Sequence, residues 1–398
     1  MPKINRNLLC LWLSSLLLMA CQSSENPLDA IMASQSGPIK NITDNLGQHE
    51  VQILLTQIDR DENGIPSFTE HGFQLDDKQY FYPASTAKFP TAVMALQHLH
   101  DIQGRLPGIN KETPFKILQK STEDVVLDVD STQENGATTI AHLIKKVFLV
   151  SDNDAYNFLF HFVGRGPINA EMKKRNMGPS QLNHTFGTSI RTATPGPYIF
   201  QTDKGGISVE TNGDTKLKYR LKGLLKGKGF TDDEGKLTEE PFDFSEKNYF
   251  SIRSLNQVLK AVIFPESLPE EERFDLTEDD YEFLRFWMSR NALESEYPNY
   301  NDGQHWDSYV KFFMYGDTKD PMPDHIRIYN KVGQAYGTST DVAYIKDSKN
   351  DIEFMLVATV LTNGNGIFND GKYEYDELGV PFLAELGRQV YQYELKRK

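Results

Sequence analysis

A serine and a lysine three residues apart, Ser85 and Lys88, are the first residues in the chain whose types and spacing could do chemistry. They begin an apolar stretch that predicts a helix over residues 85–99, and positions i and i+3 share one face of a helix. A serine hydroxyl is a poor nucleophile until a base takes its proton, and a desolvated lysine can be that base. The start of a helix also favours a developing negative charge. Ser308 and Lys311 repeat the pattern, however, and Ser85 could instead cap the helix beside a solvated lysine.

A second group of short polar side chains, Ser151-Asp152-Asn153, falls in a break between two predicted apolar helices, residues 140–147 and 155–163. Such a break projects polar side chains into a cleft. There Ser151 could carry a proton to a leaving group, and the Asn153 amide could bind a substrate carbonyl. Ser, Asp and Asn are also the best helix caps, so the tripeptide could equally cap the second helix.

A third group, Lys331-Val332-Gly333, ends a predicted strand. Gly333 would let a substrate approach the strand backbone closely. Lys331 would supply positive charge for a substrate carboxylate, or would hold the hydroxyl of Ser151. Each group by itself is unremarkable, so their meaning depends on the elements that bring them together.

Strands at both ends of the chain, with mostly helices between them, are the elements that would position these residues. Apolar patterning predicts strands at residues 51–58, 78–82, 326–332, 341–346 and 352–361. It predicts helices at residues 28–46 (with interruptions), 85–99, 140–147, 155–163, 254–264, 277–290 and 378–395. This order predicts an α/β (α+β) fold, in which an antiparallel sheet flanked by helices is formed from both termini and an all-helical domain is inserted into it.

The same patterning sets the expected domain boundaries. Residues 28–84 and 300–398 would form the α/β domain, and residues 85–299 the helical domain. Gly, Thr and Lys are frequent from about residue 165 to residue 235, without a sustained amphipathic helix, and the irregular region would extend to about residue 250. We therefore expect an irregular insertion there.

The N-terminus has the features of an export signal. Residues 1–20 combine Lys3 and Arg6 with a short apolar stretch that is too short to span a bilayer. The ending Leu18-Met19-Ala20-Cys21 resembles a bacterial lipoprotein signal, so Cys21 would be the lipidated first residue; a plain signal peptide cut nearby is the alternative. Residues 21–27 would be a polar tether. We expect a location in the bacterial cell envelope, held by a lipid anchor on the periplasmic side, with the outer membrane favoured.

Composition and charge limit the classes of partner that the protein could bind. A chain of 398 residues is long enough for two domains, and a net charge of -14 argues against nucleic acid or anionic lipid as the main partner. The histidines show no metal-ligand spacing beyond His98-x-His100, which lies on a predicted core helix. We expect no metal and no cofactor, no membrane contact other than the lipid anchor, and a monomer.

Taken together and in order, the three groups resemble the S-x-x-K, S-D-N and K-T-G motifs of penicillin-recognising serine enzymes. The flanking residues are similar to those of the class A β-lactamase catalytic domain: Ser-Asp-Asn-x-Ala-x-Asn at 151–157, and Thr340-Asp341-Val342-Ala343-Tyr344-Ile345 after Gly337. The resemblance covers roughly residues 45–175 and 325–395. The resemblance implies the fold that the order of strands and helices also predicts. It further implies a small-molecule β-lactam or a cell-wall peptide as the substrate.

The resemblance also implies roles for individual residues. Ser85 would be the acylated nucleophile, Lys88 its base, Ser151 a proton relay and Lys331 the support of that relay. Asn153 would hold the substrate amide. Gly333 would line the substrate site, and the backbone N–H groups of Ser85 and Gln334 would form the oxyanion hole.

Two departures from the family pattern bear on the substrate and on turnover. Val332 stands where the family has a Thr or Ser hydroxyl that contacts the substrate carboxylate. The Glu, followed four residues later by Asn, that activates the deacylating water in class A enzymes has no counterpart in the expected place, since residues 181–201 contain no acid. Glu240, followed by Pro241, is a late and weak candidate because Phe244 stands where Asn would be.

These observations lead to one functional prediction with two alternatives. The prediction is a β-lactamase-like serine hydrolase of class A type that opens a β-lactam amide through a Ser85 acyl-enzyme. One alternative is a D-Ala-D-Ala-type peptidase or an esterase with slow deacylation, which the missing Glu favours. The other is a non-catalytic module that binds cell-wall peptide, against which the intact Ser85, Lys88, Ser151 and Lys331 argue.

Overall fold

The computed structural model describes residues 26–119, 122, 124–187, 195–210 and 219–398. The predicted signal at residues 1–20, the predicted lipidation site Cys21 and most of the predicted tether lie outside these residues. Within them, no helix combines the length and the apolar character needed to cross a bilayer. The first described element, α1, begins at Pro27, and the side chain of Asn26 caps it.

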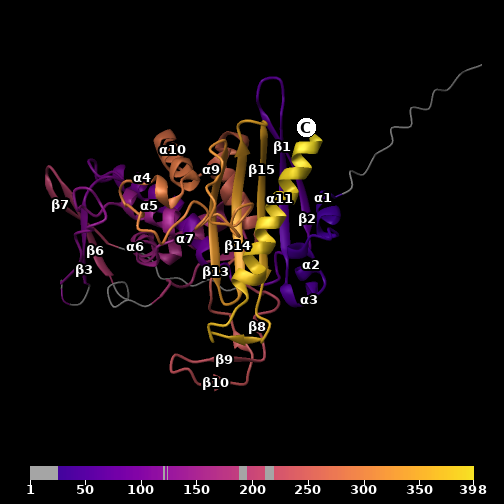
Figure 1. The fold of residues 1–398 in the computed structure, drawn as a ribbon. Coiled ribbons are helices and arrows are strands. Elements are labelled where there is room, and N and C mark those ends of the chain that lie inside the picture. Colours follow the sequence, from indigo (N-terminus) through magenta and orange to yellow (C-terminus); the bar gives the residue numbers. More distant parts are fainter. Residues whose placement is uncertain (1–25, 120–121, 123, 188–194, 211–218) are drawn as a thin grey trace, which may run out of the picture.

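A five-stranded antiparallel sheet forms the centre of the molecule, with the strand order β13-β14-β15-β1-β2 (Figure 1). Its strands are β1 (Gln52–Arg60), β2 (Pro66–Phe73), β13 (Ile326–Ala335), β14 (Thr338–Asp347) and β15 (Ile352–Leu361). Because β1 pairs directly with β15, the two ends of the chain share one sheet. The predicted antiparallel sheet formed from both termini is confirmed.

Both faces of this sheet are covered, because successive residues of its central strands pack into two different cores. On β1, Leu54 belongs to one buried cluster and Leu55 to the other; on β15, Val357 and Leu356 divide in the same way. In Figure 1, one layer of helices lies to the right of the sheet and the remaining helices lie to its left. The right-hand layer consists of α1 (Pro27–Met32), α2 (Gly37–Thr43), α3 (Leu46–His49) and α11 (Val380–Arg397).

The helices on the other side come from the long segment between β2 and β13. They are α4 (Lys88–Gln103), α5 (Ile140–Val150), α6 (Asn153–Val163), α7 (Arg165–Lys174), α9 (Ile252–Ile263) and α10 (Glu278–Ser289). Buried residues occur all around α4, which packs between α5 and α6. This helix is therefore a rigid base for the residues at its N-terminus.

The prediction of an all-helical insertion is incomplete, because the inserted segment also carries a four-stranded sheet of order β4-β3-β6-β7. Its strands are β3 (Phe115–Gln119), β4 (Val125–Leu127), β6 (Pro195–Thr202) and β7 (Gly205–Val209). The sheet joins the helices through the hydroxyl of Tyr198, which donates to the carbonyl of Phe158 at 2.6 Å. Burial alternates along β3 and β6, but both strands are short and their sequences mix apolar and polar residues on the two faces, so the sequence alone does not predict them.

Two local predictions are wrong. Residues 78–82 are not a strand: Gln79 forms a single bridge with Lys222, and the edge strand is the more polar β2. The apolar residues Tyr80, Phe81 and Tyr82 are instead buried in the core, where they pack against other aromatic rings. The segment after Gly164, expected to be irregular, begins with the helix α7.

The remaining described elements are short. The small strands are β5 (Ser180–Gln181), β8 (Leu225–Lys226), β9 (Gly229–Thr231), β10 (Leu237–Thr238), β11 (Phe242–Asp243), β12 (Tyr249–Phe250) and β16 (Ile367–Phe368). The single turns of helix are Ala84–Ala87, Pro265–Ser267, Glu270–Glu272, Ala292–Glu294 and Tyr375–Gly379. The first and the last of these turns flank the candidate site.

Candidate active site

Ser85 lies on a 3₁₀ turn, Ala84–Ala87, that leads directly into α4. The α-helix proper begins at Lys88, later than predicted, yet a 3₁₀ turn also aligns positions i and i+3. Ala84 has a φ of +46°, a left-handed conformation that costs energy in a residue with a Cβ and recurs at functional sites. Ser85 is half-buried, so its hydroxyl is open to a ligand.

Lys88 is fully buried beneath this turn. Its Nζ donates to the carbonyl and the hydroxyl oxygen of Ser151 and to Oδ1 of Asn153, the last at 2.6 Å. No hydrogen bond joins Lys88 to Ser85 in the structure; in unliganded sites such contacts often form only once substrate is bound. Burial lowers the pKa of Lys88 to about 7, and the nearby Asp152 carboxylate opposes that shift. A neutral amine is therefore accessible near neutral pH.

Ser151 ends α5 in a left-handed conformation, with a φ of +59°, and so turns its side chain toward α4. Its Oγ lies 3.3 Å from Nζ of Lys88 and 2.8 Å from Nζ of Lys331. The predicted break between two helices is confirmed. Helix capping is also present, because Asp152 accepts a hydrogen bond from the N–H of Ala155 at the start of α6. Ser151 thus remains available for proton transfer.

Lys331 is buried at the edge of the sheet, on β13. Its Nζ donates to Oγ of Ser151 and to the carbonyl of Val332, each at 2.8 Å. Burial, and next the positive charge of Lys88, lower the pKa of Lys331 well below its usual value. Of the two roles predicted for Lys331, the geometry matches support of the Ser151 hydroxyl.

Gly333 allows β13 to pack against the turn that carries Ser85. A Cβ at this position would lie 2.8 Å from the backbone nitrogen of Thr86 and 2.9 Å from that of Ser85, and would also meet the carbonyl of Pro83. Contacts under 3.0 Å to backbone atoms cannot be relieved by moving a side chain. Gly333 is therefore needed for close packing of the protein itself, and it places the next residue, Gln334, beside the nucleophile.

Ser85, Ser151, Val332 and Gln334 line one pocket of about 360 Å³. Trp306, Tyr309, Phe312, Asp376 and Val380 also line it. The pocket thus brings together residues from the turn before α4, the end of α5, β13 and the segments that precede β13 and α11. Asn153 lies beside Lys88, whose Nζ donates to its Oδ1, and it is not among the residues that line the pocket, so its predicted contact with the substrate amide stays a prediction.

Sequence reasoning missed three notable members of this pocket: Trp306, Tyr309 and Asp376. Trp306 and Tyr309 lie in a segment without regular patterning, where the sequence offers no positional signal. Asp376 lies on the single turn Tyr375–Gly379 before α11. Glu240, the weak candidate for a deacylating base, is exposed and does not line the pocket.

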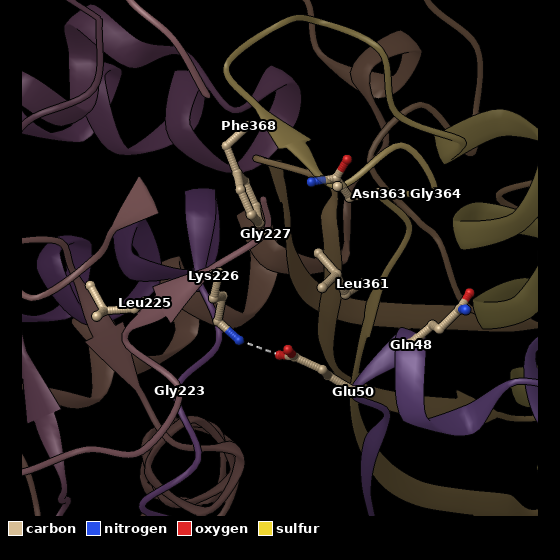
Figure 2. Close-up of a pocket in the computed structure, with 11 residues that line it drawn as sticks. Gln48, Glu50, Gly223, Leu225, Lys226, Gly227, Leu361, Asn363, Gly364 and Phe368 are labelled. Atoms are coloured by element: carbon tan, nitrogen blue, oxygen red, sulfur yellow. Dashed lines mark hydrogen bonds and ion pairs between the residues drawn. The ribbon is translucent and has the colours of Figure 1, made fainter. Parts of the chain in front are cut away.

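A second pocket, of about 340 Å³, lies between β8 and the segment after β15 (Figure 2). Lys226 points toward Glu50 across it and forms an ion pair with it. Asn363 and Phe368 lie on the opposite side. None of the predicted site residues lines this pocket, and it contains no Ser, Cys or Thr that could act as a nucleophile. Among the residues that the structure describes, no three His, Cys, Asp or Glu side chains are grouped in a way that could hold a metal ion.

Comparison with known proteins identifies the family. Residues 38–394 match the model of the β-lactamase enzyme family, so the chain belongs to this family. The resemblance to β-lactamases that the three motifs indicated is confirmed at the level of the family. A search of curated proteins gave no match.

Solved structures of β-lactamases are similar only at low identity. A β-lactamase from Sphaerobacter thermophilus is 13% identical, with 92% of this chain and 96% of that chain covered and a TM-score of 0.48. A β-lactamase from Burkholderia ambifaria is also 13% identical, with 88% and 95% covered and a TM-score of 0.47. Identities this low carry no information about substrate or rate.

Proposed function

We propose that the chain is a serine hydrolase that opens the amide of a β-lactam through an acyl-enzyme on Ser85. The observation that carries this proposal is the chain of contacts from Lys88 through Ser151 to Lys331, beside a half-buried serine that lines a pocket. A purely binding protein would not need two buried lysines on one hydroxyl. Burying such groups is costly, and the cost is typical of a site selected for chemistry.

In the proposed reaction, the Ser85 hydroxyl attacks the amide carbonyl while neutral Lys88 takes its proton. The carbonyl oxygen becomes an oxyanion, which the N–H groups of Ser85 and Gln334 would stabilise. The C–N bond then breaks, and Ser151 passes a proton to the leaving nitrogen and is reprotonated from Lys88. The product of this half-reaction is an ester on Ser85 that water must hydrolyse.

The second half-reaction is where this chain departs from class A enzymes. Residues 181–201 contain no acid, and Glu240 does not line the pocket. Without a carboxylate in the class A position, we expect the ester on Ser85 to be long-lived. This favours a second candidate function, a D-Ala-D-Ala-type peptidase or an esterase. A β-lactam would acylate Ser85 of such an enzyme, and the resulting ester would be hydrolysed slowly.

An intact-mass time course of the protein without its first 20 residues, mixed with a penicillin, tests the proposal. We expect a mass increase of one penicillin on the wild type and none on Ser85→Ala. Rapid loss of the adduct with product accumulation would support a β-lactamase, and persistence would support the slow peptidase or esterase. The absence of an adduct at any penicillin concentration would contradict both candidates.

The location is a separate proposal, supported by the sequence alone. We propose that Cys21 is lipidated and anchors the protein in the bacterial envelope, facing the periplasm. Full-length protein made in a bacterial host should then partition into detergent, and Cys21→Ser should partition into water. Equal partitioning of the two would contradict the lipid anchor.

A further inference from the structure

The pocket at Ser85 has an unusual charge for a site expected to take a carboxylic acid. Among the described residues that line it, the one with a charged side chain is Asp376. Lys88 and Lys331 lie behind the lining, with their Nζ atoms 3.3 and 2.8 Å from Oγ of Ser151. Val332 occupies the position at which the family presents a hydroxyl to the substrate carboxylate. The exposed Lys319 lies 4.3 Å over the ring of Trp306 but is not part of the lining.

Asp376 is held in place by its neighbours, although it is exposed. The hydroxyl of Tyr375 accepts a hydrogen bond of 2.8 Å from the N–H of Gly337, in the tight turn between β13 and β14. Glu374 accepts one of 3.0 Å from the N–H of Gly364. These contacts fix the turn Tyr375–Gly379 against the end of β13, where Gln334 lies.

The carboxylate of Asp376 is not used by any interaction within the described structure. It makes no hydrogen bond and no ion pair with another described residue. The lining also includes the apolar or aromatic side chains of Val332, Val380 and Trp306. Aromatic faces attract cations, and a carboxylate in a partly enclosed pocket attracts a cation and repels an anion.

We propose that Asp376 makes this pocket selective for acyl compounds that carry an ammonium or guanidinium group, and against those that carry a carboxylate. This inference rests on the proposed acyl-enzyme on Ser85 and specifies its substrate class. The natural substrate is then a cationic amide or ester. Burial lowers the pKa of both Lys88 and Lys331, which reduces the positive charge that these two buried lysines set against Asp376.

Three forms of one penicillin provide the probe: the free acid, its methyl amide and its 2-aminoethyl amide. They share one ring and one side chain, and differ in charge at the end that the family binds through a hydroxyl. The rate of Ser85 acylation is measured for each by intact mass at low salt, with Ser85→Ala as the blank. The informative quantity is the ratio of the 2-aminoethyl amide rate to the free acid rate, compared among variants.

We expect Asp376→Asn to lower this ratio roughly five-fold, the size of one partly screened ion pair, and Asp376→Lys to lower it further. The matched control is Glu377→Gln, which removes the same charge from the next residue of the same turn. Glu377 is exposed and does not line the pocket, so its substitution should leave the ratio unchanged. Raising the salt concentration should also reduce the wild-type ratio.

The failures of the two proposals are distinguishable. If all three probes acylate Ser85 and neither Asp376 variant changes the ratio, the selectivity proposal is wrong while the acyl-enzyme stands. If Asp376→Asn instead slows loss of the adduct equally for all probes, Asp376 acts in deacylation and the selectivity proposal is again wrong. If no probe acylates folded wild-type protein, both proposals are wrong.

Discussion

The chain contains two Ser-x-x-Lys pairs, and their surroundings differ. Lys88 and Lys311 are both buried, and burial lowers the pKa of each to about 7. Lys311 donates to the carbonyls of Met288 and Ile328 and to Oδ1 of Asn330, while the Ser308 hydroxyl donates to the carbonyl of Thr318.

The comparison shows that a lowered pKa does not by itself identify a catalytic lysine. Lys311 is enclosed by fixed acceptors and bonds to no hydroxyl, whereas Lys88 contacts the hydroxyl of Ser151 beside the open Ser85. Both serines line the same pocket, but Ser308 is buried with its hydroxyl bonded to a carbonyl, whereas Ser85 is half-buried. The partners of the lysine and the exposure of the serine, rather than burial of the lysine, separate the structural pair from the reactive one. Each of the following predictions tests this separation.

The largest expected effect is on acylation by Lys88→Met. We expect the rate of Ser85 acylation by a penicillin to fall about 10³-fold, because no other base would take the proton. Intact-mass kinetics measure the rate, and circular dichroism checks that the variant is folded. A fall of similar size in folded Lys311→Met would abolish the distinction between the two lysines.

Lys311→Met should mainly affect stability. It leaves three oxygens without their donor and removes the positive charge near the buried Asp341, whose pKa burial raises to about 6. We expect the free energy of unfolding to fall by about 3 kcal/mol. Urea unfolding measures it. A variant as stable as the wild type would show that Lys311 is not structural.

The pH dependence of acylation should report Lys88. Only the neutral amine accepts a proton, and the pKa of Lys88 is about 7. The acylation rate should therefore fall about ten-fold per pH unit below that value and level off above it. Lys311→Met should leave the midpoint where it is. A midpoint that moves in this variant would assign the titration to the other lysine.

The smallest effect is expected for Ser308→Ala. This change removes the hydrogen bond of 2.6 Å to the carbonyl of Thr318. The cost should be about 1 kcal/mol of unfolding free energy, with the acylation rate near that of the wild type.

Ser151→Ala, the matched change in the reactive group, should instead lower the acylation rate about 10²-fold. Similar kinetics for the two variants would contradict the relay role of Ser151.

Much of the fold and the motif residues could be predicted from sequence. The strand β15 is apolar at nearly every position, so its patterning is clear. The strands β13 and β14 carry apolar segments, residues 326–332 and 341–346, among their polar residues. Ser85, Lys88, Ser151 and Lys331 share types and order with a known family, and the structure brings them together.

What could not be predicted depends on contacts between distant segments. The edge strand β2 is largely polar, so its sequence does not predict a strand. Residues 80–82 are apolar because they pack in the core, and for this reason the sequence predicted a strand at residues 78–82 instead. Asp376 has no local pattern that ties it to Ser85; the turn that carries it reaches the pocket through its contact with Gly337. The negative charge that Asp376 brings to the pocket therefore could not be predicted from the sequence.

Mapping the modified serine tests the central claim most directly. The wild-type protein is mixed with a penicillin, quenched in acid, digested, and the peptide that carries the added mass is sequenced by mass spectrometry. The account predicts modification of Ser85 alone, with Ser308 untouched although it belongs to the same sequence pattern. Modification of Ser308, or of any residue other than Ser85, would contradict it.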